Sequence, residues 1–273
     1  MKLFLYRLSL TDQYAGGLFE GVYEPEISRE EFLRRRLSSS FGFDYRKGIR
    51  LRYEFIQEDR GIIAAALCRW IPETAENDPA DPFAQSEGGR WKRAAVFCNI
   101  SDDQQVVGLE DVNGVGTPDS ILGGLVETIN AFTLGEPYRI DAEALPRSGS
   151  FREAVSGFPG PITSIKFDLV VPNPPDAEKE TREALKRLRE ETGMERRKEE
   201  LSSEHGLNVD SEYINGFVQY SEEGGGNIVA KSASEEVYNS NKMVRYATIS
   251  DELRPTGSPI KNLFNALIEI LMK

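Results

Sequence analysis

Few side chains in this sequence are of the types that carry out covalent chemistry. The chain has 273 residues but a single histidine, His205, and two cysteines, Cys68 and Cys98. Any Ser–His–Asp or Cys–His arrangement would have to use His205, and the sequence has no GxSxG nucleophile elbow. We expect His205 to cap a helix C-terminus and both thiols to be buried and reduced. A structural zinc site needs about four such ligands, so none is expected.

Carboxylates suggest a second chemistry, metal-dependent cleavage of a phosphodiester. Glu110 lies at a predicted strand end, and Asp141 and Glu143 share one face of another predicted strand. Carboxylates placed in this way could hold magnesium. Because no lysine follows them at the spacing of a nuclease core, a metal-dependent phosphodiesterase or nuclease is the alternative and not the leading hypothesis. The leading hypothesis assigns no catalytic residue, metal or cofactor. Whether the protein is an enzyme stays open, and a protein without catalytic activity is favoured.

The glycine-containing stretch NGVGTPDSILGG, residues 113–124, has the composition of an anion-binding turn before a helix. However, Gly114 and Gly116 lack a third glycine at dinucleotide-binding spacing, and no GKS or GKT follows them. We therefore predict a tight turn before a helix that starts at Pro118.

Positive charge is concentrated in one stretch of a chain whose formal net charge is −12. Residues 32–53, FLRRRLSSSFGFDYRKGIRLRY, hold seven basic residues and one acid. Arginine makes paired hydrogen bonds to phosphate oxygens, and a local patch can act separately because salt screens charges beyond about 8–10 Å. The residues predicted to contact nucleic-acid phosphates are Arg34, Arg35, Arg36, Arg46, Lys47, Arg50 and Arg52.

The same stretch also admits a structural interpretation. Glu30 and Glu31 precede Arg34 and Arg35 by four residues, so these could form surface ion pairs on a helix. Phe41, Phe43 and Tyr45 could stack on unpaired bases or pack in the core. Two further segments, GGRWKR (88–93) and NKMVRY (241–246), would extend the basic surface if the fold brings them to it.

The elements around these residues predict an α+β fold, in which antiparallel hairpins form one or two mixed sheets packed by several helices. Ser28 begins a capping box for a helix ending near Leu37, and residues 49–57 alternate as a strand that turns at EDRG (58–61). We expect an N-terminal domain, 1–135, with an acidic mobile loop at 72–89. A C-terminal domain, 136–273, should contain a charged helix over 176–204, a hairpin formed by EYINGFVQY and NIVAKSA, and an amphipathic helix over 258–273.

The order of elements in ITSIKFDLVVPNPPDAEKETREALKRLRE followed by INGFVQYSEEGGGNIVAKSA resembles that of RexA-like phage-exclusion proteins. It also resembles small uncharacterised proteins of bacterial mobile elements and defence loci. The likeness covers roughly residues 136–250. It implies a DNA-binding, dimeric sensor without catalysis.

These observations together predict a non-catalytic nucleic-acid-binding protein of bacterial antiviral defence, with DNA a stronger candidate than RNA. A protein-interaction subunit, whose helix 258–273 would pair with its own copy or with a defence partner, is a further alternative. The opening MKLFLYRLSL is interrupted by Arg7, and no apolar run approaches the roughly 20 residues that cross a bilayer. We therefore expect a cytoplasmic protein.

Overall fold

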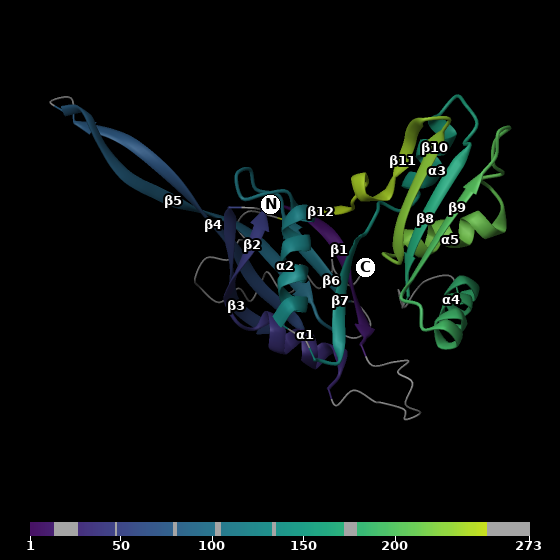
Figure 1. Cartoon of the computed structure of the whole chain (residues 1–273), viewed down its shortest axis with the longest axis horizontal. Coiled ribbons are helices and arrows are strands. Elements are labelled where there is room, and N and C mark those ends of the chain that lie inside the picture. Colours follow the sequence, from purple (N-terminus) through teal and green to yellow (C-terminus); the bar gives the residue numbers. More distant parts are fainter. Residues whose placement is uncertain are drawn as a thin grey trace.

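The computed structural model describes residues 1–13, 27–46, 48–78, 81–101, 105–132, 135–171 and 179–249, with the backbone alone for 74–87 and 179–180. Within these ranges the chain forms five helices and twelve strands, arranged in two antiparallel sheets (Figure 1). This is the α+β class that the sequence predicts.

The first sheet has eight strands in the order β12-β1-β6-β5-β4-β3-β2, and β7 also pairs with β1. β12 and β7 follow one another along one edge of β1, while β6 occupies the other edge. The strands are β1 (Lys2–Asp12), β2 (Phe41–Arg46), β3 (Ile49–Asp59), β4 (Ile62–Asp78), β5 (Asp81–Asn99), β6 (Val106–Glu110), β7 (Tyr138–Ala144) and β12 (Tyr246–Thr248).

Helix α1 (Arg29–Leu37) packs on one face of this sheet and begins as its sequence predicts. The Ser28 hydroxyl accepts a hydrogen bond from the Glu31 backbone N–H at 3.1 Å, which satisfies one of the free donors at the helix start. The Glu31 carboxylate does not reach back to the cap, because Arg34 and Arg35 bind it. At the helix end, the buried Tyr53 hydroxyl of β3 donates to the Leu37 carbonyl at 2.9 Å.

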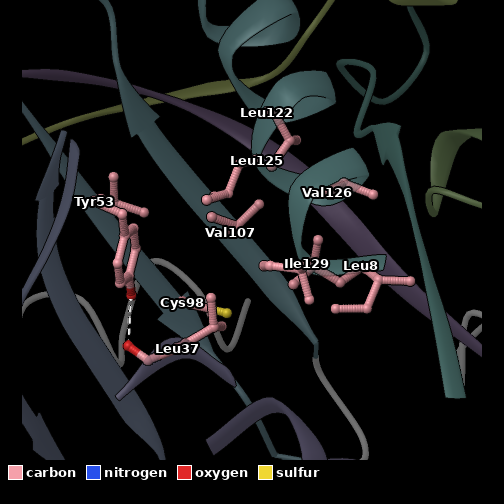
Figure 2. Close-up of a pocket in the computed structure, with 11 residues that line it drawn as sticks. Leu8, Leu37, Tyr53, Cys98, Val107, Leu122, Leu125, Val126 and Ile129 are labelled. Carbon is pink, nitrogen blue, oxygen red and sulfur yellow. Dashed lines mark hydrogen bonds between the residues drawn. The ribbon is translucent and has the colours of Figure 1, made fainter. Parts of the chain in front are cut away.

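Helix α2 (Pro118–Phe132) covers the same face and closes the main core. Beneath it lies a void of about 20 Å³, lined by side chains from α1, from α2 and from the strands (Figure 2). The Tyr53 hydroxyl at its rim is already bound to Leu37, and burial raises the pKa of the Cys98 thiol to about 12. An apolar gap of this size is a packing defect too small for a ligand.

Residues 72–89 do not form the predicted acidic mobile loop. Residues 72–78 and 81–89 continue β4 and β5, whose pairing runs from Ile62–Asn99 to Asp78–Asp81, so the two strands leave the sheet as a long hairpin arm (Figure 1). The prediction rested on composition, but each strand of a two-stranded arm has an unpaired outer edge, where proline can lie without removing a ladder hydrogen bond.

The second sheet has the order β11-β10-β8-β9 and its own apolar core. Helix α5 lies against β10, and the core also includes Phe151 of α3 and Leu185 of α4. Its elements are α3 (Ser150–Gly157), β8 (Ser164–Val170), α4 (Lys179–Thr192), β9 (Arg196–Ser202), α5 (Glu212–Glu222), β10 (Gly226–Ser232), β11 (Glu235–Asn239) and the short 3₁₀ helix η1 (Ser240–Lys242).

Two predictions for this half are corrected. The charged helix expected over 176–204 ends at Thr192, and after Gly193 (φ 72°) the chain becomes β9, which pairs with β8. EYINGFVQY is helix α5 and not a strand, so NIVAKSA pairs with β8 and β11 instead. A helix signal was present: Ser211 caps the helix, and Ile214, Phe217 and Val218 bury one face at helical spacing.

The halves of the chain meet at β7. Arg196 of β9 donates to Glu143 of β7 at 2.9 Å, and Arg7 of β1 donates to the Glu223 carbonyl at 3.2 Å. The expected domain boundary near residue 135 stays a prediction, and β7 and β12, which follow it in sequence, pair with β1. Among the described residues, no helix is both long and apolar enough to cross a membrane. The predicted helix over 258–273 lies outside the described residues.

Candidate functional site

The structure divides the predicted basic residues between the two faces of the first sheet. Arg34, Arg35 and Arg36 belong to α1 in the helical layer. Arg34 contacts three carboxylates, those of Glu30 (2.5 Å), Glu58 (2.8 Å) and Glu31 (3.2 Å). These hydrogen bonds raise the pKa of Arg34, and the bond to Glu58 has the largest effect.

The other two predicted arginines in α1 are paired as well. Arg35 binds Glu31 at 2.9 Å and Arg36 binds Glu136. The hydrogen bond from Arg35 is the main reason that the pKa of Glu31 is lowered. Ion pairs therefore occupy all three of the predicted arginines in α1, so the helix is a poor candidate for binding a polyanion.

Arg46 is the last residue of β2, and Lys47 is the next residue in the sequence. The Arg46 guanidinium lies 4.9 Å from the centre of the Tyr45 ring and donates to the Ser120 hydroxyl at 3.4 Å, so it lies at the start of α2. Lys47 lies outside the described residues. The Arg46 guanidinium therefore lies in the helical layer and not beside the remaining two arginines.

Arg50 and Arg52 lie on the opposite face of β3, away from the helices. Their neighbours Leu51 and Tyr53 are buried in the core under α1 and α2, and side chains alternate along a strand. The Arg50 side chain crosses β2 over Gly42, where a Cβ would lie 3.0 Å from its Nε. The two arginines are therefore about 7 Å apart on the face opposite α1 and α2.

Strand pairing adds a third arginine to this face. Arg52 is opposite Cys68 of β4, and Cys68 is opposite Arg93 of β5, so the three form a row across three strands. Directly opposed residues point to the same face, and neighbouring strands are about 4.8 Å apart. Burial is the main cause that raises the pKa of the Cys68 thiol. The charges of Arg93, Glu54 and Arg52 also influence this pKa, so these three side chains lie near the thiol.

Two tryptophans lie on the same face, one on β4 two residues after Cys68 and one on β5 two residues before Arg93. Trp70 and Trp91 are directly opposed, with ring centres 5.4 Å apart at 62°. The Trp70 indole crosses over Gly89, since a Cβ there would lie 2.4 Å from the ring. Even so, 45% of Trp70 and 48% of Trp91 stay exposed. We call this set the arginine–tryptophan face: Arg50, Arg52, Cys68, Trp70, Trp91 and Arg93.

Acidic residues border this face. Glu54 binds Arg52 at 2.7 Å, and Asp44 is opposite Arg50 in the pairing of β2 with β3. The side chains of Arg52 and Glu54 are 57% and 35% exposed, and exposed ion pairs of this kind contribute little, about 0–1 kcal/mol. Within the described part of the chain, Arg50 and Arg93 have no carboxylate at ion-pair distance.

Only one of the two segments proposed to extend the basic surface contributes to this face. Of GGRWKR, Arg93 and Trp91 join the arginine–tryptophan face, whereas Lys92 points to the other side and donates to the Asn113 carbonyl at 2.9 Å. NKMVRY does not join it, because Tyr246 is opposite Phe4, which packs against the core under the helices. Residues 88–93 thus supply Trp91 and Arg93, and β4 supplies Cys68 and Trp70, none of which the basic stretch includes.

The glycine stretch is a turn, as predicted, and not an anion site. Gly114 has a φ of 89°, and its carbonyl and that of Asn113 accept hydrogen bonds from Arg69 (3.0 Å) and Lys92 (2.9 Å). The Tyr45 hydroxyl accepts a hydrogen bond from the Thr117 N–H at the helix start. The turn therefore directs carbonyl oxygens at cations, the reverse of a phosphate loop.

The residues considered for covalent or metal chemistry have structural surroundings. Buried Glu110 accepts from the Ala95 N–H at 3.0 Å, and buried Glu143 binds Arg196. Within the described ranges, no three His, Cys, Asp or Glu side chains lie close enough to hold a metal ion. His205 is exposed in the turn after β9 and does not cap a helix, which corrects that prediction.

Fold and site together define a two-sheet α+β protein with arginines and exposed tryptophans on the sheet face opposite α1 and α2. Residues 115–252, about half of the chain, match the family model DUF4747, a domain of unknown function, and the chain belongs to this family. The match lies C-terminal to β2–β5, which carry the site. No curated protein and no solved structure matches the chain. The likeness to RexA-like phage-exclusion proteins and the defence role stay predictions.

Proposed function

We propose that this protein binds nucleic acid, without catalysis, through the arginine–tryptophan face. The observation that supports this most is the row Arg52–Cys68–Arg93, which strand pairing places beside the exposed pair Trp70–Trp91. Arginines bind phosphate oxygens, and aromatic rings between them can contact bases. The proposal keeps Arg50 and Arg52 from the sequence analysis and replaces the paired arginines of α1 by Arg93.

The charge of the chain sets the expected strength of this binding. The net charge of −12 repels a polyanion overall, so affinity depends on the local arginines. If Arg50, Arg52 and Arg93 each neutralise one phosphate, log affinity should fall with log salt with a slope of about −2 on a single strand. This modest dependence is that of a short binding site, not of a protein that coats nucleic acid.

Reversing two of the charges tests the proposal. Arg52→Glu with Arg93→Glu should weaken binding of a labelled oligonucleotide at least tenfold in fluorescence anisotropy, because each substitution removes a phosphate contact and adds repulsion. The matched control is Arg147→Glu with Arg187→Glu, two exposed arginines in surface ion pairs elsewhere, which makes the same change in net charge.

The two variants must behave differently for the proposal to stand. The control should keep affinity within about threefold, because charges beyond a Debye length are screened. Equal losses in both variants would show a response to total charge, and undiminished binding by Arg52→Glu with Arg93→Glu would remove the proposal. Thermal unfolding of both variants checks that the fold is kept.

A second substitution should tighten binding. Glu54→Gln removes the carboxylate that competes for Arg52, so affinity is expected to rise about two- to fivefold, the equivalent of one exposed ion pair. Glu58→Gln is the control on the same strand, since Glu58 binds Arg34 at 2.8 Å in the helical layer. An equal gain in both variants would contradict a site on the arginine–tryptophan face.

A further inference from the structure

We propose that the ligand of the arginine–tryptophan face is single-stranded nucleic acid, whose bases stack on Trp70 and Trp91 while its phosphates contact Arg52 and Arg93. This inference rests on the function proposed above and names its ligand. It concerns the shared chemistry of unpaired bases on a phosphate backbone, so both DNA and RNA are ligands in principle.

The spacing of the face suits alternating contacts to bases and phosphates. Trp91 and Arg93 are two residues apart on β5, about 7 Å, and both point to the same side. Trp70 has the same relation to Cys68, the central member of the arginine row. A strand crossing the sheet therefore meets rings and guanidinium groups in adjacent rows.

The tryptophan pair has a structural role that does not account for its exposure. A cross-strand aromatic pair stabilises a hairpin, and Trp70 also covers Gly89. Yet β4 and β5 stay paired for eight more residues towards Asp78 and Asp81, so the pair does not terminate the ladder. About half of each indole still faces water, beside arginines, on the sheet face opposite α1 and α2.

Single strands suit this face better than a duplex. Bases of a duplex are stacked on each other, so only phosphates and groove edges would meet the protein, and the indole faces would have no partner. The positive charges of the three arginines exceed the negative charges of Asp44 and Glu54 by only one, so phosphate contacts alone would give weak binding. Stacking supplies the missing affinity, about five- to 150-fold for each base on an aromatic ring.

A two-stranded β-ribbon can also enter the major groove of a duplex, so the β4–β5 arm offers a competing geometry. In that case the contacts would lie along the arm. The arginine row instead lies at the base of the arm, where β3 still pairs with β4 at Arg52–Cys68. This position favours a ligand laid across the sheet.

The chain itself contains the reporter for the test. Trp70 and Trp91 are its only two tryptophans, so intrinsic fluorescence reports on this face in the unmodified full-length protein. Three ligands of equal length are titrated: a single-stranded oligothymidine, a duplex, and a single-stranded abasic oligonucleotide that keeps phosphates but lacks bases. Anisotropy of end-labelled versions reports binding independently, and free N-acetyltryptophanamide controls for non-specific quenching.

We expect the oligothymidine to bind and to quench the tryptophan fluorescence, and the duplex and abasic ligands to bind at least tenfold more weakly without quenching. Equal or tighter binding of the duplex, or binding of the oligothymidine without quenching, would overturn this inference but leave the proposed function standing. No anisotropy change with any of the three ligands would overturn both.

Discussion

Replacing Trp70 and Trp91 together by alanine is expected to weaken binding of single-stranded oligonucleotide at least 30-fold. The physical reason is the loss of two stacking surfaces, each worth about 1–3 kcal/mol per base. The slope of log affinity against log salt should stay the same, because Arg50, Arg52 and Arg93 still meet the phosphates. Fluorescence anisotropy at several salt concentrations measures both quantities.

The matched control is Trp70→Phe with Trp91→Phe, which keeps an aromatic pair across β4 and β5. Phenylalanine still presents a π face, so this variant should lose no more than about fivefold in affinity. Far-UV circular dichroism and thermal unfolding separate loss of the arm from loss of stacking. If the phenylalanine variant binds as poorly as the alanine variant while both stay folded, the rings do not act by stacking.

Unfolding at different pH values should reveal a buried carboxyl at the junction of the two halves. Glu143 of β7 accepts from Arg196 of β9 at 2.9 Å, and Arg196 also donates to Asp168 at 2.9 Å. Burial is the largest cause that raises the pKa of Glu143 to about 7, although Arg196 lowers it; Asp168 and Asp141 raise it further. The protonated carboxyl is therefore the form that the folded protein prefers.

The raised pKa of Glu143 determines how the stability of the protein changes with pH. The pKa of Glu143 rises from 4.5 in the unfolded chain to about 7 in the folded protein. Between these values the unfolded chain binds fewer protons, so the contribution of Glu143 to stability is complete below pH 4.5 and is lost as the pH rises towards 7. The loss amounts to about 3 kcal/mol of unfolding free energy.

Glu143→Gln should remove this loss, because glutamine stays neutral and its side-chain oxygen can still accept from Arg196. Relative to the natural protein, the variant is expected to gain about 2 kcal/mol in unfolding free energy between pH 5.5 and pH 8, measured by urea denaturation. Glu153→Gln, at an exposed carboxylate paired with Arg147, is the control and should show no comparable change. A pH-independent difference between Glu143→Gln and the natural protein would contradict the shift.

Local patterns predicted the elements that depend on local physics. The Ser28 cap, the alternation through Leu51 and Tyr53, and the turn at Arg60–Gly61 all appear where the sequence places them, because each depends on residues close in the chain. The segment 212–222 shows the limit, since its apolar residues fit both a strand and a helix period. The cap at Ser211 is the signal that distinguishes them.

The site depends on distant residues, so the sequence indicated it only in part. Arg50 and Arg52 could be chosen from the strand pattern, but their relation to Arg93 depends on the register of three strands. Likewise, the pairing of Arg36 with Glu136 joins residues 100 positions apart. A charge run by itself does not distinguish free arginines from arginines neutralised by partners of this kind.

The hairpin arm also limits where a bound strand can go. Residues 72–89 contain five acids and no base, and the backbone of this segment extends β4 and β5 beyond the tryptophan pair. If the protein binds nucleic acid as proposed, phosphates approaching that end would be repelled by the negative charge of this segment. We expect a ligand to be deflected towards the edge strand β2, which would confine its footprint on the protein to a few nucleotides.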